Sequence, residues 1–257
     1  MEMGADMPAA GSFDQYARHF SKFNTADPRS AFGGYDLNLS HLLPTDREAS
    51  ILDFGCGMGH LLLYLKDRGY VRAEGVDISP SQIDYCHSIG LDNARFAADP
   101  ISFLESCPNR YQRVLSLDVF EHLPKDQLIP TLTAIRNAMA YGAEFIMRVP
   151  NIAAAIGPWT RYQDFTHELS YTDRSARQVL EDAGFGAIQV NANKTYYNHT
   201  FRGKMFECAR KVLYNTLKLV YFLQAPGTLT PNIFTNDMVV IGRKCEWSPT
   251  RDLPTCL

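Results

Sequence analysis

The amino-acid sequence predicts an α/β fold in which helices cover both faces of a doubly wound, mostly parallel sheet. Strand-like and helix-like segments alternate five times between residues 50 and 150. The strand-like segments are short and apolar, and helical segments stop at Gly69, Gly90 and Gly142. Short alternating segments of this kind are typical of parallel sheets with helices on both sides.

The elements follow one another in a regular order along this core. The expected strands cover residues 51–54, 73–77, 94–97, 113–117 and 143–149. Between them, helices are expected at 60–68, 81–89 and 125–141, and Ser79-Pro80 begins the second of these. Ligands of such sheets bind at the carboxyl ends of the strands, so the loops after strands should carry the function.

The segments on either side of the core have a different pattern. Apolar residues at helical spacing predict helices over 12–24 and 35–43, separated by Gly33-Gly34. After residue 150 we expect a loop with many aromatics (151–170), a helix (172–183), a strand (186–193), an amphipathic helix (205–223) and a last strand (237–243).

Length and composition indicate one globular domain. The chain has 257 residues, of which 46% are hydrophobic and 21% charged. We expect a flexible leader (1–11) and a single domain (12–257), divided into a helical cap (12–46), a ligand-binding core (47–150) and an acceptor-side part (151–257). The net charge of −3 argues against a protein that holds nucleic acid through phosphates.

The sequence shows no export or membrane-spanning signal. The first ten residues, MEMGADMPAA, lack a basic start followed by an apolar run, and no apolar stretch is long enough to cross a bilayer. A cytoplasmic protein is therefore expected.

A glycine-rich turn follows the first core strand. Its sequence is Asp53-Phe54-Gly55-Cys56-Gly57-Met58-Gly59, and Asp77 ends the next strand. Glycines let the backbone turn tightly and approach a ligand, and the following helix directs free N–H groups toward it. A carboxylate at the position of Asp77 can accept hydrogen bonds from ribose hydroxyls.

This turn resembles the first motif of class I S-adenosylmethionine (SAM)-dependent methyltransferases. A dinucleotide fingerprint would need Gly or Ala where this chain has His60. Segments 75–79, 96–99 and 117–124 are similar to the later motifs of the same family, in the right order. The second of these resembles the turn whose acid, here Asp99, meets the adenine amine. The resemblance implies a seven-stranded sheet with an antiparallel last strand, N-terminal helices and an amphipathic helix inserted before the last strand. It implies SAM contacts from Asp53, Gly55, Cys56, Gly57, Gly59, Asp77, Ile78, Asp99 and Asp118.

Two histidines on loops after strands are the candidate catalytic residues. His122 and His167 should face the same end of the sheet, and imidazole suits the removal of a hydroxyl proton near neutral pH. The alternative for His122 is that it only orders its loop.

A metal site is a second interpretation of the same region. Asp118, Glu121 and His122 form D-x-x-E-H, which resembles the E-x-x-E-H of family members that bind a divalent ion. Mg²⁺ or Mn²⁺ would suit these ligands, with His167 as a further one. Asp118 could instead contact SAM.

The acceptor side offers aromatic and amphipathic surfaces. Its aromatic residues could form a lid, a core or a carbohydrate site; they are Trp159, Tyr162, Phe165, Tyr171, Tyr196 and Tyr197. The helix within 204–223 could pack on the domain, form a homodimer or lie peripherally on the inner face of the membrane.

Resemblance to methyltransferases of bacterial glycan and polysaccharide clusters, carried by Val149-Pro150-Asn151, residues 164–168 and the late helix, implies O-methylation of a sugar hydroxyl on a glycan or lipid-linked glycan. The alternatives are a small-molecule O-methyltransferase of the quinone or natural-product kind, a non-catalytic SAM-binding partner subunit, and an NAD-dependent oxidoreductase.

Overall fold

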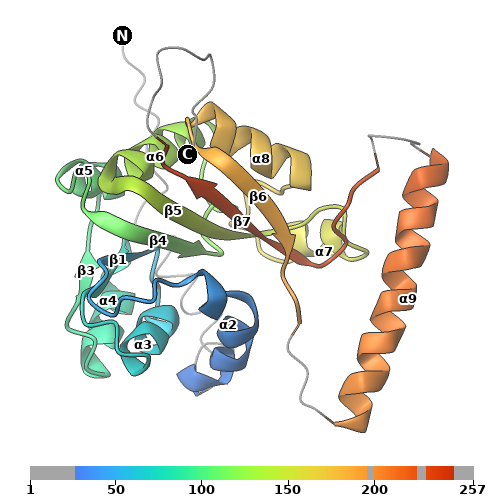
Figure 1. Ribbon diagram of the computed structural model, residues 1–257, viewed down its shortest axis with the longest axis horizontal. Helices are drawn as coiled ribbons and strands as arrows, with labels where there is room; N and C mark the ends of the chain where they lie inside the picture. Colours follow the sequence, from blue (N-terminus) through green and yellow to red (C-terminus); the bar gives the residue numbers. More distant parts are fainter. Residues whose placement is uncertain (1–26, 196–199, 225–229, 246–257) are drawn as a thin grey trace.

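A seven-stranded sheet forms the centre of the protein. The computed structural model describes residues 27–195, 200–224 and 230–245 (Figure 1). The strands are β1 (Ile51–Phe54), β2 (Ala73–Asp77), β3 (Ala94–Phe96), β4 (Tyr111–Leu117), β5 (Met139–Pro150), β6 (Gly186–Ala192) and β7 (Asp237–Arg243).

The strand order is β3-β2-β1-β4-β5-β7-β6. Strands β1 to β5 pair in parallel, whereas β7 runs antiparallel to both β5 and β6. The predicted sheet, with its antiparallel last strand, is therefore confirmed. Its order reverses between β1 and β4, where the carboxyl ends of neighbouring strands open a crevice for a ligand.

Helices cover both faces of this sheet. The helices of the described residues are α2 (Phe32–Asn38), α3 (His60–Asp67), α4 (Pro80–Ser88), α5 (Pro100–Glu105), α6 (Lys125–Ala138), α7 (Gly157–Tyr162), α8 (Asp173–Asp182) and α9 (Phe201–Gln224), with 3-10 turns η1 (Pro28–Ala31) and η2 (Ser40–Leu42). Of these, α9 covers neither face.

Side chains alternate along each strand and build a separate core on each face. Leu52 and Val114 point to the face covered by α5, α6 and α8, whereas Ile51 and Leu115 point to the face covered by α2, α3 and α4. All four residues of β1 are buried, as expected for a central strand with helices on both sides.

Several predicted boundaries were wrong. Gly33 and Gly34 lie inside α2 and do not break it, because Phe32 and Tyr35 pack their rings on Tyr64 of α3 and this packing outweighs the low helix propensity of glycine. The helix expected to reach Tyr141 ends at Ala138, where β5 begins. Short helices α5 and α7 were not predicted as helices, and the helix expected at 12–24 lies outside the described residues.

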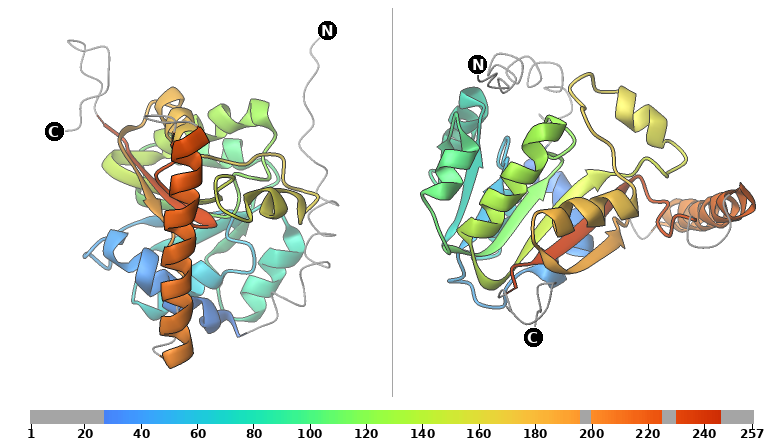
Figure 2. Two further views of the ribbon diagram at one scale, coloured as in Figure 1. Left: turned by 90° about the vertical axis from the view of Figure 1, so that its right-hand side faces the viewer. Right: turned by 90° about the horizontal axis from the view of Figure 1, so that it is seen from above.

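Helix α9 stands apart from the layered domain (Figures 1 and 2). Among its residues, all of which the structure describes, Gly203 is the only one that is buried. In the described part of the chain, no helix has both the length and the apolar character that crossing a bilayer requires.

Candidate active site

A cavity of about 290 Å³ opens at the carboxyl ends of β1, β2, β4 and β5. One end is formed by the glycine-rich turn and the end of β2, and the other by the loop after β4. The lining residues include Tyr35, Asp53, Gly55, Cys56, Gly57, Met58, His60, Asp77, Ile78, Gln82, Leu117, Asp118, Val119, His122, Leu123 and Arg148.

The glycine-rich turn needs its glycines for two physical reasons. Gly55 and Gly57 have φ values of +74° and +52°, in the left-handed region that side chains disfavour. A Cβ on Gly55 would lie 2.4 Å from Cγ2 of Val119, and one on Gly57 would lie 2.8 Å from Oε1 of Gln82. Gly59, the N-cap of α3, does not line the cavity, and a Cβ there would lie 2.6 Å from Cδ1 of Leu91. The bare backbone therefore forms one wall of the cavity.

Two carboxylates line the cavity beside this wall: Asp53 is buried, and Asp77 is half-buried. Asp77 accepts hydrogen bonds from the N–H groups of Gly57 (2.8 Å) and Ser79 (2.9 Å). Burial raises the pKa of Asp77, and these backbone donors oppose the rise. Burial, with the nearby charge of Asp77, raises the pKa of Asp53 to about 8. Oδ2 of Asp53 has no hydrogen-bond partner among the described residues, so a polar or cationic ligand could stabilise its ionised form.

The opposite wall carries an ion pair between Asp118, which the sequence analysis named, and Arg148, which it did not. Arg148 of β5 donates from Nε to Oδ1 of Asp118 at 2.8 Å and from Nη2 to Oδ2. The pair forms because Leu117 and Arg148 lie opposite each other in the β4–β5 register. The negative charge of Asp118 raises the pKa of Arg148, against the effect of burial. The only sequence signal for Arg148 was a charged residue within an apolar strand.

Asp99 differs from its expected role as an adenine contact. It is the N-cap of α5, where its carboxylate accepts from the N–H groups of Ile101 (3.0 Å) and Ser102 (3.2 Å) and from the Ser102 hydroxyl. It does not line the cavity, whereas the next residue, Pro100, does. The carboxylate of Asp99 is thus engaged in capping the N-terminus of α5.

His122 is held by a chain of hydrogen bonds. The Thr166 hydroxyl donates to Oδ1 of Asp164 at 2.7 Å, and Nδ1 of His122 lies 2.9 Å from the same hydroxyl oxygen. Because the hydroxyl proton is used on Asp164, Nδ1 of His122 donates and Nε2 carries the lone pair. Burial, and secondly His167, lowers the pKa of His122, which keeps the imidazole neutral near pH 7.

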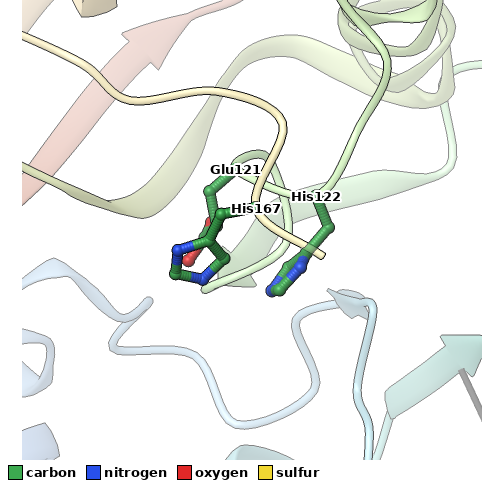
Figure 3. A group of neighbouring side chains, drawn as sticks. All are labelled: Glu121, His122 and His167. Atoms are coloured by element: carbon green, nitrogen blue, oxygen red, sulfur yellow. The ribbon is translucent and has the colours of Figure 1, made fainter. Parts of the chain in front are cut away.

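His167 and Glu121 complete a cluster with His122 (Figure 3). Nδ1 of His167 lies 3.0 Å from the Thr160 carbonyl oxygen, which can only accept, so Nδ1 carries a proton and donates it to this oxygen. The two imidazole rings are 4.8 Å apart. Oε2 of the buried Glu121 has no hydrogen-bond partner among the described residues.

One ligand atom from each of these three residues lies within 4.8 Å of the others. The loops meet because the N–H groups of Glu168 and Leu169 both donate to the Glu121 carbonyl oxygen, at 2.7 and 2.9 Å. Of the residues expected to form a metal site, Glu121, His122 and His167 therefore lie together, whereas Asp118 pairs with Arg148 and lies outside this group.

The aromatic residues of the acceptor side do not share one environment. Tyr171 is buried and donates a hydrogen bond to the Phe120 carbonyl oxygen, so it is a core residue. Trp159, Tyr162 and Phe165 are exposed on α7 and the turn after it. Tyr196 and Tyr197 lie outside the described residues. Tyr35 of α2, which sequence reasoning missed, lines the cavity.

The fold and the cavity agree with the comparison to protein families. Residues 28–190 match a family described as a methyltransferase domain. The chain belongs to this family of methyltransferase domains, and it has the class I SAM-dependent methyltransferase fold.

Solved structures and a curated relative are similar to parts or most of the chain. A SAM-dependent methyltransferase from Archaeoglobus fulgidus is 21% identical, with a TM-score of 0.64 over 89% of this chain and 99% of that one. Phosphoethanolamine N-methyltransferase 2 of Haemonchus contortus, with bound S-adenosylhomocysteine, is 16% identical, with a TM-score of 0.58 over 94% of this chain and 59% of that one.

A 2-heptyl-1-hydroxyquinolin-4(1H)-one methyltransferase of Mycobacteroides abscessus is 32% identical over 108 residues. This match covers 40% of the chain and 47% of the relative, so the chain spans about half the length of the curated protein.

Proposed function

We propose that this methyltransferase methylates a hydroxyl group, and that the acceptor is a sugar hydroxyl of a glycan or lipid-linked glycan. The observation that carries the choice of oxygen is His122, a neutral imidazole at the cavity wall whose Nε2 holds a lone pair. A hydroxyl must lose its proton as it is methylated, and a neutral imidazole is suited to accept it.

The cavity residues fit SAM as the methyl donor. The glycine-rich turn offers bare backbone, and Asp77 at the end of β2 lines the cavity and could accept hydrogen bonds from ribose hydroxyls. The unpartnered Oδ2 of Asp53 leaves a buried polar atom near the turn that a ligand could contact. SAM supplies an electrophilic methyl group, so the chain itself needs to bind, orient and exclude water.

His167 acts as a positioning residue in this proposal. It does not line the cavity, but its ring packs edge-on against His122. Thr166 and Asp164 fix the tautomer of His122 from the other side.

The Glu121–His122–His167 cluster also fits a divalent cation. Two imidazole nitrogens and one carboxylate are a donor set for Mn²⁺, Fe²⁺ or Zn²⁺ more than for Mg²⁺, which prefers oxygen ligands. A bound ion would lower the pKa of an acceptor hydroxyl. The unpartnered Oε2 of Glu121 supports this proposal, because a buried carboxylate without a partner is costly.

Two observations bear on the acceptor, and they favour different candidates. Exposed Trp159, Tyr162 and Phe165 follow β5 on the segment that leads to His167, and their rings could stack on the apolar faces of a sugar. The similarity to a hydroxyquinolone methyltransferase favours the second candidate, a small-molecule O-methyltransferase.

Product analysis tests this proposal. Labelled SAM, the full chain, and glycan, glycolipid or hydroxyquinolone acceptors would be incubated together. A methyl ether on a sugar supports the preferred acceptor. Label found only in the quinolone overturns that acceptor and favours a small-molecule O-methyltransferase. Tight SAM binding with no transfer to any acceptor would indicate a non-catalytic subunit.

Substitution of His122 tests the chemical role. We expect His122→Ala to lower kcat by about 10²- to 10⁴-fold without changing the Kd for SAM. His41→Ala, at an exposed histidine outside the cavity, is the matched control. Equal kcat values for His122→Ala and the wild type would contradict the assignment.

Metal binding has a readout that does not depend on activity. We expect Mn²⁺ titration, followed by electron paramagnetic resonance, to show one site per chain that Glu121→Gln weakens at least about tenfold. If the wild type binds none of Mn²⁺, Fe²⁺ and Zn²⁺ and a chelator does not change its activity, the metal proposal is wrong. His122 would then act as a base without a metal ion.

A further inference from the structure

Helix α9 presents its most apolar face away from the domain. The residues turned toward the domain recur on one side of the helix; they are Gly203, Arg210, Tyr214, Leu217 and Tyr221, which are buried or half-buried. Tyr221 packs its ring 5.6 Å from that of Phe234, and Arg210 donates a hydrogen bond to Thr195. These contacts fix which side of α9 faces inward.

The opposite side is an exposed apolar stripe. Met205, Val212 and Leu219 recur every seven residues, and Phe201 and Leu223 extend the row at the two ends. All five side chains are exposed, and that of Val212 is 66% accessible. At 3.6 residues per turn they lie about half a turn away from Gly203 and Arg210. A stripe of this size on a helix that stands clear of the domain indicates a surface that binds something.

Basic residues border this stripe. Lys204, Lys211 and Lys218 also recur every seven residues and form a row along one margin. The helix has five basic residues and a single acidic one, Glu207, which pairs with Lys211 at 2.9 Å. The whole chain, in contrast, has a net charge of −3. Positive charge is thus concentrated on α9.

Exposed aromatics lie on the same side of the molecule. In Figure 1, α7 lies between the sheet and α9 in the right-hand half of the molecule, and the right view of Figure 2 shows the two helices separated on that side. Trp159 and Tyr162 of α7 are exposed, as is Phe165 after it. Tryptophan and tyrosine are enriched where protein meets the interface of a bilayer.

We propose that α9 lies in the plane of an anionic lipid bilayer surface, with its apolar stripe among the headgroups and its lysine row on their phosphates. A long helix with one apolar face and a basic margin is suited to this position, and it does not need to span the bilayer. Charge decides against pairing with a second copy, because two such helices would bring like charges together. The inference does not depend on which acceptor is methylated.

Vesicle co-sedimentation of the full chain tests this proposal. We expect binding to vesicles of phosphatidylcholine with phosphatidylglycerol, much weaker binding to phosphatidylcholine alone, and a decrease with added salt. Replacement of Lys204, Lys211 and Lys218 together by glutamine should weaken binding to the anionic vesicles about tenfold or more. Equal sedimentation with both vesicle types, or an unchanged affinity of the triple variant, overturns the proposal.

A matched pair of substitutions tests the apolar stripe. Val212→Glu should abolish vesicle binding, whereas Val71→Glu, at a valine that is 69% exposed and lies outside α9, should leave it unchanged. As a control for folding, both variants should show a rise in Tm when SAM is added. Equal loss from both variants overturns the proposal, as does a wild-type dimer that Val212→Glu converts to a monomer without any vesicle binding.

Discussion

Asp53 is a buried carboxylate that lines the cavity, and its burial costs stability when it is ionised. Its folded pKa of about 8 lies above the ordinary value of 3.8, because burial and Asp77 disfavour the ionised form. The folded state therefore binds more protons than the unfolded state between about pH 4 and pH 8. Over this range the contribution of Asp53 to stability falls as pH rises.

Asp53→Asn is expected to remove this penalty. The Tm of the variant should rise relative to that of the wild type between pH 5 and pH 9, and the variant should bind SAM more weakly. Scanning calorimetry without SAM at both pH values checks the difference. The effects of the other carboxylates on Tm are the same in both proteins and cancel in this comparison. A Tm difference that does not change with pH would contradict the raised pKa of Asp53.

Asp77 and Asp99 are two acidic residues with different roles. Asp77→Asn should raise the Kd for SAM at least about tenfold, because a hydrogen bond to a charged group contributes about 1.5–3 kcal/mol. Asp99→Ala should lower the free energy of unfolding by about 1 kcal/mol through loss of the α5 cap, with the Kd unchanged. Calorimetric titration and urea unfolding measure both quantities. A weaker Kd in Asp99→Ala would restore its predicted role at the adenine.

At the scale of elements, the turn between β1 and α3 is held against the loop after β4. Gly55→Ala would place a Cβ 2.4 Å from Val119 and would impose a positive φ on alanine, so we expect a loss of about 1–3 kcal/mol. Adding Val119→Ala should relieve the contact and recover part of the loss. A double-mutant cycle in urea measures this, and strictly additive effects would show that the two residues do not interact.

The two loops that carry His122 and His167 are the other decisive pair of elements. They are joined by backbone hydrogen bonds from Glu168 and Leu169 to Glu121. Sequence spacing cannot show such a contact, because the residues are more than forty positions apart. The sequence offered both histidines as candidates, and the loop contact places their rings together.

At the scale of the whole molecule, the cavity joins the first strands, the later strands and the N-terminal helix α2. SAM at about 100 times its Kd should add about 2.7 kcal/mol to the free energy of unfolding. For a chain of this size that corresponds to a rise in Tm of roughly 5–10 °C. Differential scanning fluorimetry with NAD at the same concentration is the control, and a shift with NAD alone would favour an oxidoreductase.

The sequence by itself determined the sheet, the glycine-rich turn and the position of Asp77. These features depend on local patterns: apolar strands, glycines that permit positive φ, and the fixed length of a strand–helix–strand unit. They could be predicted because each is encoded within about thirty residues of chain.

Only the tertiary structure decided which side chains work together. Arg148 pairs with Asp118 because the register of β4 and β5 places them side by side. His167 lies near Glu121 because backbone hydrogen bonds connect their two loops. The outward direction of the apolar stripe on α9 likewise depends on Tyr221 packing against Phe234. Such pairings depend on register and packing between distant segments, so local sequence patterns cannot specify them.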